Sequence, residues 1–204
     1  MTRTRVIAVD PAAPDPAVLR EAAGTLARGG LVAFPTETFY GLGASGLDAR
    51  AVGRLLAAKG RPEGKPILLL VDSVSMAETL ALDTGPTARA LMARHWPGAL
   101  TLVLRARSEI PVEVTAGTGT VGVRVSPHPV AFGLVRALGG PVTAPSANLS
   151  GEPPPTLAAA VLARLDGRID LVLDGGGAPG GEPSTVLDVT VEPPRVLRQG
   201  AVRP

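Results

Sequence analysis

Apolar residues recur along the chain in two spacings, one typical of helices and the other of short buried strands. The first helix is predicted to begin after Asp15-Pro16, an N-cap followed by proline at the first helical position. It is predicted to end at Gly29-Gly30. Between these signals the apolar residues recur every three or four positions, as one buried helix face requires: Val18, Leu19, Ala22, Ala23 and Leu26.

Short apolar runs alternate with further helical patterns and then crowd together near the end of the chain. Strands are predicted at 31–34, 67–71, 100–105, 120–125, 141–144, 170–173, 185–190 and 195–199. Helices are predicted after Asp48, twice within 74–95, at 129–138 and at 156–165, while 35–46 is predicted to be a loop. This order indicates an α/β fold in one domain, with a mixed, twisted open sheet and flanking helices.

Composition narrows the possible classes of function. The chain has 204 residues, 45% of them hydrophobic and 19% charged, which is typical of a globular protein. It has no cysteine, so disulfides, thiolate nucleophiles and sulfur-bound metals are excluded. The two histidines, His95 and His128, have no metal-ligand spacing, so no metal ligands are predicted. A net charge of +2 and five aromatic residues are a weak argument for nucleic-acid binding.

The start of the chain bears on its location. The first ten residues hold only four apolar residues in a row, too few for a signal peptide or a membrane span. We therefore expect a cytoplasmic protein without a membrane association.

The stretch KGRPEGKP at 59–66 places three cations, two glycines and two prolines directly before an apolar strand. Prolines fix the backbone, and rigid presentation of Lys59 and Arg61 suits a multiply charged oxyanion. The alternative is a solvated turn in which Lys59 only favours the C-terminal dipole of its helix. In either case the stretch is polar, so we expect that truncating Lys59 or Arg61 leaves no cavity.

Three further stretches carry polar groups beside apolar strands. FPTETFYGLG at 34–43 holds three hydroxyls and Glu37, and by itself indicates a turn. Arg124 lies in an apolar strand, where arginine needs a carboxylate or phosphate partner, which an internal Asp or Glu also provides. Ser146 and Asn148 alternate in APSANLSG at 144–151, so an extended backbone would project both the same way, although a polar turn is the alternative.

Seven stretches, in order, resemble the YrdC-like family of L-threonylcarbamoyladenylate synthases over nearly the whole chain: FPTETFYGLG, KGRPEGKPILLLV, WPGALTLVL, VGVRVSPHP, APSANLSG, STVLDV and VLRQGAV. The resemblance implies the YrdC-like fold and a nucleotidyltransferase. Such enzymes condense L-threonine, bicarbonate and ATP to threonylcarbamoyl-AMP and pyrophosphate. A tRNA-modifying transferase then uses the product to make threonylcarbamoyladenosine in tRNA.

The resemblance also implies roles for particular residues. The implied catalytic residues are Lys59, Arg61, Ser146 and Asn148. The implied ATP-binding residues are Lys59, Arg61, Glu63, Thr120, Ser146, Pro154 and Arg198. The implied threonine-binding residues are Thr36, Arg124, Ala144 and Ser184. Mg²⁺ is expected to be held mainly through the ATP phosphates rather than by the protein.

The chain departs from the family pattern at two places. Ser126 stands where the family commonly has proline, and we expect this change to soften the strand end near Arg124. Pro154 begins a Pro-Pro-Thr sequence where Ser-Pro-Thr is usual. Because the chain stops soon after its arginine motif, residues 1–204 are expected to form a single catalytic domain.

Two alternative functions remain open on the sequence. The first is an RNA-binding or ribosome-assembly module of the same fold. The second is a paralogue that acts on another carbamoyl substrate. The modest net charge and few aromatic residues predict at most weak binding of tRNA or other RNA.

Overall fold

The fold contains two β-sheets in the computed structural model, which describes residues 3–60 and 64–204. The four-stranded sheet has the order β1-β8-β2-β3, with bounds Arg5–Ala8, Leu171–Asp174, Val32–Pro35 and Tyr40–Gly43. The six-stranded sheet has the order β10-β9-β5-β6-β4-β7, with bounds Arg195–Arg198, Thr185–Asp188, Leu100–Arg105, Thr120–Arg124, Leu68–Leu70 and Val142–Thr143. Parallel and antiparallel pairs occur in both sheets, so the predicted mixed character is confirmed.

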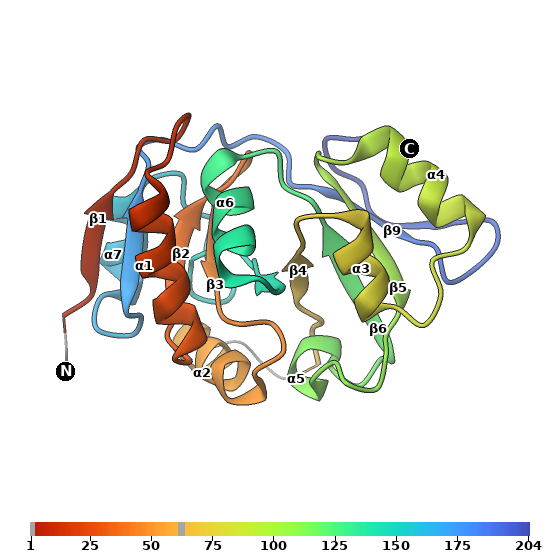
Figure 1. Cartoon of the computed structure of the whole chain (residues 1–204), viewed down its shortest axis with the longest axis horizontal. Helices are drawn as coiled ribbons and strands as arrows, with labels where there is room; N and C mark the ends of the chain where they lie inside the picture. Colours follow the sequence, from red (N-terminus) through yellow and green to blue (C-terminus); the bar gives the residue numbers. More distant parts are fainter. Residues whose placement is uncertain (1–2, 61–63) are drawn as a thin grey trace.

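Helices flank both sheets. Their bounds are α1 Pro16–Ala27, α2 Ala49–Lys59, α3 Val74–Leu80, α4 Pro86–His95, α5 Val112–Thr115, α6 Pro129–Leu138 and α7 Ala158–Leu165. Figure 1 shows α1, α6 and α7 beside the four-stranded sheet and α3 and α4 beside the six-stranded sheet. The predicted start of α1 is confirmed, because the Asp15 carboxylate caps it by accepting the Ala17 N–H at 2.7 Å.

One segment, residues 142–147, joins the two sheets. On one side the N–H of Ala144 donates to the Leu68 carbonyl beside β4. On the other side the N–H of Ala147 donates to the Tyr40 carbonyl, and the N–H of Leu42 donates to the Pro145 carbonyl, so the segment also bonds to β3. The predicted single sheet is therefore divided into two sheets that meet along this segment.

Several short elements differ from their predictions. Residues 40–43 were predicted as a loop but form β3, which pairs antiparallel with β2. The sequence YGLG lacks the apolar side chains that indicate a strand, because Gly41 and Gly43 leave room for the Phe34 ring. Strand β1 and the single-turn helix α5 had no predicted counterpart.

The strand β4 allows a test of the core. Leu69 is fully buried, and it pairs with Val123 of β6 and Thr143 of β7. Leu69→Ala is expected to lower the free energy of unfolding by about 2–5 kcal/mol, because a cavity remains where the side chain was. The matched control is Leu82→Ala at a 62% exposed position, with an expected change below about 0.5 kcal/mol. Denaturant unfolding measures both, and the folded fraction of Leu69→Ala should keep most of its activity; equal stabilities would contradict the assigned core.

Candidate functional site

A cleft of about 1120 Å³ lies between the two sheets. Its walls come from the β2–β3 turn, strands β4, β5, β6, β9 and β10, and the joining segment. Eight of the residues implied by the family resemblance line it: Thr36, Thr120, Arg124, Ala144, Ser146, Pro154, Ser184 and Arg198. Residues as far apart in the sequence as Thr36 and Arg198 thus line the same cleft.

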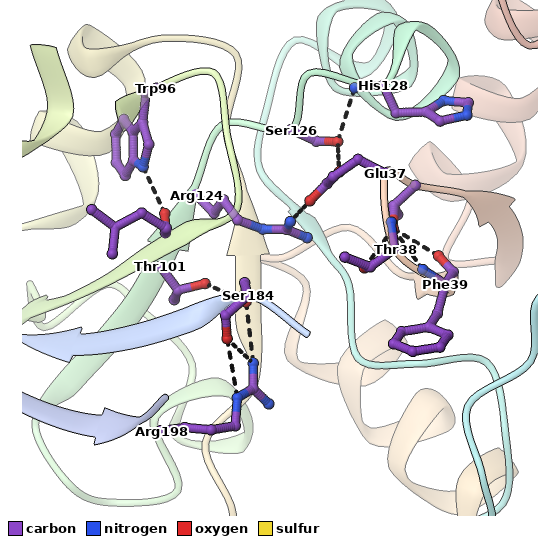
Figure 2. Close-up of polar contacts among 12 residues, drawn as sticks. Glu37, Thr38, Phe39, Trp96, Thr101, Arg124, Ser126, His128, Ser184 and Arg198 are labelled. Atoms are coloured by element: carbon purple, nitrogen blue, oxygen red, sulfur yellow. Dashed lines mark hydrogen bonds and ion pairs between the residues drawn. The ribbon is translucent and has the colours of Figure 1, made fainter. Parts of the chain in front are cut away.

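An ion pair crosses the cleft between the two sheets. Arg124, the last residue of β6, is only 3% exposed. Its Nη1 pairs with the Glu37 carboxylate from the β2–β3 turn. The Glu37 carboxylate also accepts a hydrogen bond from the Ser126 hydroxyl (Figure 2). The carboxylate partner that the sequence required for Arg124 is therefore internal. Ser126 adds a hydrogen bond at the strand end, and the expected softening relative to proline stays a prediction.

Two guanidinium groups make the cleft positive. Burial, and to a smaller extent repulsion from Arg198, lowers the pKa of Arg124 to about 10. Burial also lowers the pKa of Arg198. Because a pKa near 10 still leaves Arg124 charged at neutral pH, the cleft offers fixed positive charge to an oxyanion.

Ser184 is held on the opposite wall by two side chains. The Nε and Nη2 atoms of Arg198 donate to the Ser184 carbonyl at 3.1 and 2.8 Å, and Nη2 also donates to the hydroxyl at 3.1 Å. Thr101 Oγ1 lies 3.0 Å from the same hydroxyl (Figure 2). Gly200 permits this packing, because a Cβ there would lie 2.1 Å from the Pro183 carbonyl oxygen. Arg198, which the resemblance implies binds ATP, thus contacts Ser184, which it implies binds L-threonine.

Lys59 lies behind the cleft wall. It is the last residue of α2 and only 3% exposed, and its Nζ donates to the Ser146 carbonyl and, at 2.7 Å, to the Asn148 carbonyl. The expectation of an exposed loop residue is wrong for Lys59, because α2 continues to this position and places it on the same buried face as Leu55, four residues earlier. Arg61 and Glu63 lie outside the described residues.

Asn148 does not line the cleft. Its Nδ2 donates to the carbonyls of Leu149 and Glu152 at 2.9 and 2.7 Å, so the side chain folds back onto its own turn. Ser146, in contrast, lines the cleft, and its backbone forms an antiparallel bridge with Gly41. The expected common direction of the two side chains is therefore not observed, and the polar-turn alternative describes Asn148.

Sequence reasoning missed several residues of the site. Glu37 was noted only as part of a turn, while Thr101, Asp188 and Arg195 of the cleft wall were not noted. Asp188 accepts from Arg195 at 3.2 Å, which ties the β9 and β10 strands together. The available signal was a polar side chain in or at the end of an apolar strand, the same signal that singled out Arg124.

Metal and membrane sites can be addressed for the described part of the chain. Within residues 3–60 and 64–204, no three histidine or acidic side chains come together as metal ligands. Over the same residues, every helix is too short or too polar to cross a membrane.

These features define a class: a two-sheet α/β protein whose cleft, with two fixed guanidinium groups and several hydroxyls, is built for an anionic ligand. A family model, Sua5/YciO/YrdC, with the description "Telomere recombination", matches residues 24–200. The chain belongs to this family.

Comparison with individual proteins gives the same family. The chain is 45% identical over 184 residues to the threonylcarbamoyl-AMP synthase of Pyrococcus abyssi, covering 90% of this chain and 54% of that protein. It is 44% identical over 185 residues to the enzyme of the same name from Bacillus subtilis, with the same coverage of 90% and 54%. The structure of P. abyssi Sua5 complexed with L-threonine has a TM-score of 0.93 and 44% identity, covering 97% of this chain and 58% of that one. The chain thus spans about half the length of these relatives.

The position of Lys59 leads to a test of its role. Lys59→Met keeps the length of the side chain but removes the donor, leaving two buried carbonyl groups without this partner. We expect a loss of about 1–3 kcal/mol in stability. For a chain of this size that corresponds to a fall of roughly 2–12 °C in Tm.

The matched control for Lys59→Met is Arg94→Met, which removes an exposed cation in the last turn of α4. Calorimetry of both variants measures the difference. An unchanged Tm for Lys59→Met would show that Lys59 does not support the Ser146–Asn148 turn.

Proposed function

We propose that the chain is a nucleotidyltransferase that condenses L-threonine, bicarbonate and ATP to threonylcarbamoyl-AMP and pyrophosphate. The observation that carries this proposal is the convergence of eight implied substrate-binding residues on one cleft. The names of the relatives and the L-threonine complex of P. abyssi Sua5 support it independently.

The reaction requires alignment and charge neutralisation rather than a protein nucleophile. The threonine nitrogen forms a C–N bond with bicarbonate carbon, and water leaves, which yields a carbamate. A carbamate oxygen then attacks the α-phosphorus of ATP, the bond to the β-phosphate oxygen breaks, and pyrophosphate leaves. Because the carbamate is already an anion, preorganised cations and hydroxyls suffice to hold the reactants together.

Two groups of cleft residues are proposed to hold the two substrates. Thr36, Arg124 and Ser184 would bind L-threonine, with the Arg124 guanidinium facing its carboxylate. Thr120 and Arg198 would contact ATP. The contact between Arg198 and Ser184 supports this arrangement, because the carbamate and the α-phosphate must meet between the two substrates.

Two further participants are proposed. Mg²⁺ would be held mainly by phosphate oxygens of ATP, because this ion prefers oxygen ligands. The product would pass to a tRNA-modifying transferase, because a mixed carbamic–phosphoric anhydride is a reactive donor that a second enzyme must consume.

One observation favours RNA contact as a second candidate function. A separate cavity of about 400 Å³ lies at the α1–β8 side, away from the cleft. Five arginines line it: Arg3, Arg5, Arg28, Arg54 and Arg168. Three of them are engaged: Arg5 with Glu21 at 2.7 Å, Arg54 with Asp170 at 3.2 Å and Arg168 with the Ala58 carbonyl at 3.5 Å. Only part of this charge is therefore available to phosphates. This supports weak RNA binding, beside the synthase activity rather than instead of it.

The synthase proposal predicts a strict substrate requirement. With ATP and Mg²⁺ present, pyrophosphate release should need both L-threonine and bicarbonate, because the attacking carbamate contains both. A coupled pyrophosphate assay tests this, with reactions lacking the amino acid or containing L-serine as controls. Equal release without any amino acid would contradict the proposal, and a strong preference for another amine would identify a paralogue with a different carbamoyl substrate.

The arginine-lined cavity predicts how RNA binding depends on salt. We expect tRNA to bind with Kd values of about 10⁻⁴–10⁻⁶ M at physiological salt, as for non-specific binding. Arg28→Ala should reduce the slope of log K against log salt by about 1, because one phosphate contact is lost. The control Arg94→Ala, on α4, should leave the slope unchanged. Tight binding that resists salt would contradict this expectation.

A further inference from the structure

We propose that Ser126 and Glu37 are positioning residues that orient the Arg124 guanidinium for the carboxylate of the bound amino acid. The inference rests on the proposed function of the cleft. It assigns a specific task to Ser126, the residue at which this chain departs from the proline usual in the family.

The backbone of Glu37 is fixed by its neighbours. The Thr36 hydroxyl accepts the N–H groups of Thr38 and Phe39 at 3.2 and 3.3 Å and donates to the Phe39 carbonyl at 2.7 Å. Thr36 itself is 3% exposed. These bonds close a tight turn around Glu37, so its side chain starts from a defined point on the four-stranded sheet.

The proton of the Ser126 hydroxyl has one assigned acceptor. The oxygen of this hydroxyl accepts the His128 N–H at 3.2 Å, so its own proton is free to be donated to Glu37 Oε2. Ser126 is only 1% exposed, so water does not compete for this bond. A proline at this position would have no hydroxyl, and Glu37 would lose its donor on that side.

Glu37 passes this constraint to Arg124. One carboxylate oxygen accepts a hydrogen bond from the Ser126 hydroxyl and the other pairs with Arg124 Nη1. Rotation of the carboxylate would therefore break both contacts. The Nε atom of Arg124 is buried and has no hydrogen-bond partner among the described residues, and the side chain lines the cleft. One edge of the guanidinium is therefore fixed by Glu37, which leaves further N–H donors for a ligand carboxylate.

The same contacts set the spacing of the cleft walls. Glu37 belongs to the turn of the four-stranded sheet, while Arg124 and Ser126 belong to the end of β6 and the residues after it. Figure 2 shows these side chains meeting between the two parts of the fold. Loss of the Ser126 hydroxyl should therefore affect the threonine contact of Arg124 more than the ATP contact of Arg198, because Arg198 is anchored on Ser184 rather than on Glu37.

The test measures L-threonine binding by calorimetry in the parent and in Ser126→Ala. We expect Ser126→Ala to weaken L-threonine binding about tenfold, equivalent to about 1.4 kcal/mol, because Arg124 is no longer held in one orientation. ATP affinity should change less than about twofold, a split that a general loss of folding would not produce. Ser108→Ala, at an exposed serine outside the cleft, is the matched control and should match the parent in both affinities.

A double-mutant cycle with Glu37→Ala shows whether Ser126 acts through Glu37. In the Glu37→Ala background, adding Ser126→Ala should change threonine affinity less than about twofold. Ser126→Thr should bind threonine as tightly as the parent, because it keeps the hydroxyl. A parent-like threonine affinity in Ser126→Ala, or an effect that persists in full without Glu37, would overturn the inference. Failure of the parent itself to bind L-threonine would instead overturn the proposed function, and the inference with it.

Discussion

The backbone pairing of residues 142–147 is the constraint on which the rest of the structure depends. This short segment bonds to β4 on one side and to β3 on the other, so its backbone joins the two sheets. The Thr143 hydroxyl completes the joint, because it accepts the Ala44 N–H and donates to the Leu42 carbonyl at a fully buried position. Since buried backbone groups must be paired, the segment cannot shift without breaking bonds to both sheets. The part of the cleft that this segment lines is therefore held in place by both sheets.

Lys59 extends this rigidity to the turn that follows. Its ammonium group lies at the end of α2 and donates to the carbonyl of Ser146, within the joining segment, and to that of Asn148, just beyond it. A buried charge is costly unless hydrogen bonds satisfy it, which gives these two contacts more weight than surface contacts would have. Ser146 can thus face the cleft while Asn148 secures its own turn. The first cation of KGRPEGKP supports the wall of the site from behind, and the phosphate contact implied for it stays a prediction.

Particular residues show how far sequence reasoning reaches. Local signals located α1 through Asp15 and singled out Arg124, because capping and charge burial act over a few residues or on one side chain. The seven family stretches located most of the cleft wall. The identity of Arg124's partner was beyond local signals, since Glu37 lies 87 positions earlier and meets it only through the two-sheet arrangement. The same holds for β3, whose glycines make sense only with the Phe34 ring beside them, and for Lys59, whose buried partners at Ser146 and Asn148 lie far away in the sequence.

The electrostatics of the cleft indicate what its arginines are for. Arg124 and Arg198 both have lowered pKa values, caused chiefly by burial, and both are charged in the unfolded chain. A lowered pKa in the folded state means that folding holds these cations at a cost in stability throughout the pH range in which they are charged. Glu37 offsets part of this cost for Arg124, while Arg198 donates to the neutral Ser184. An anion in the cleft would reduce the remaining repulsion between the two guanidinium groups. The two cations therefore cost folding stability without an anion and would be stabilised by one, the balance expected of residues that bind an anionic ligand.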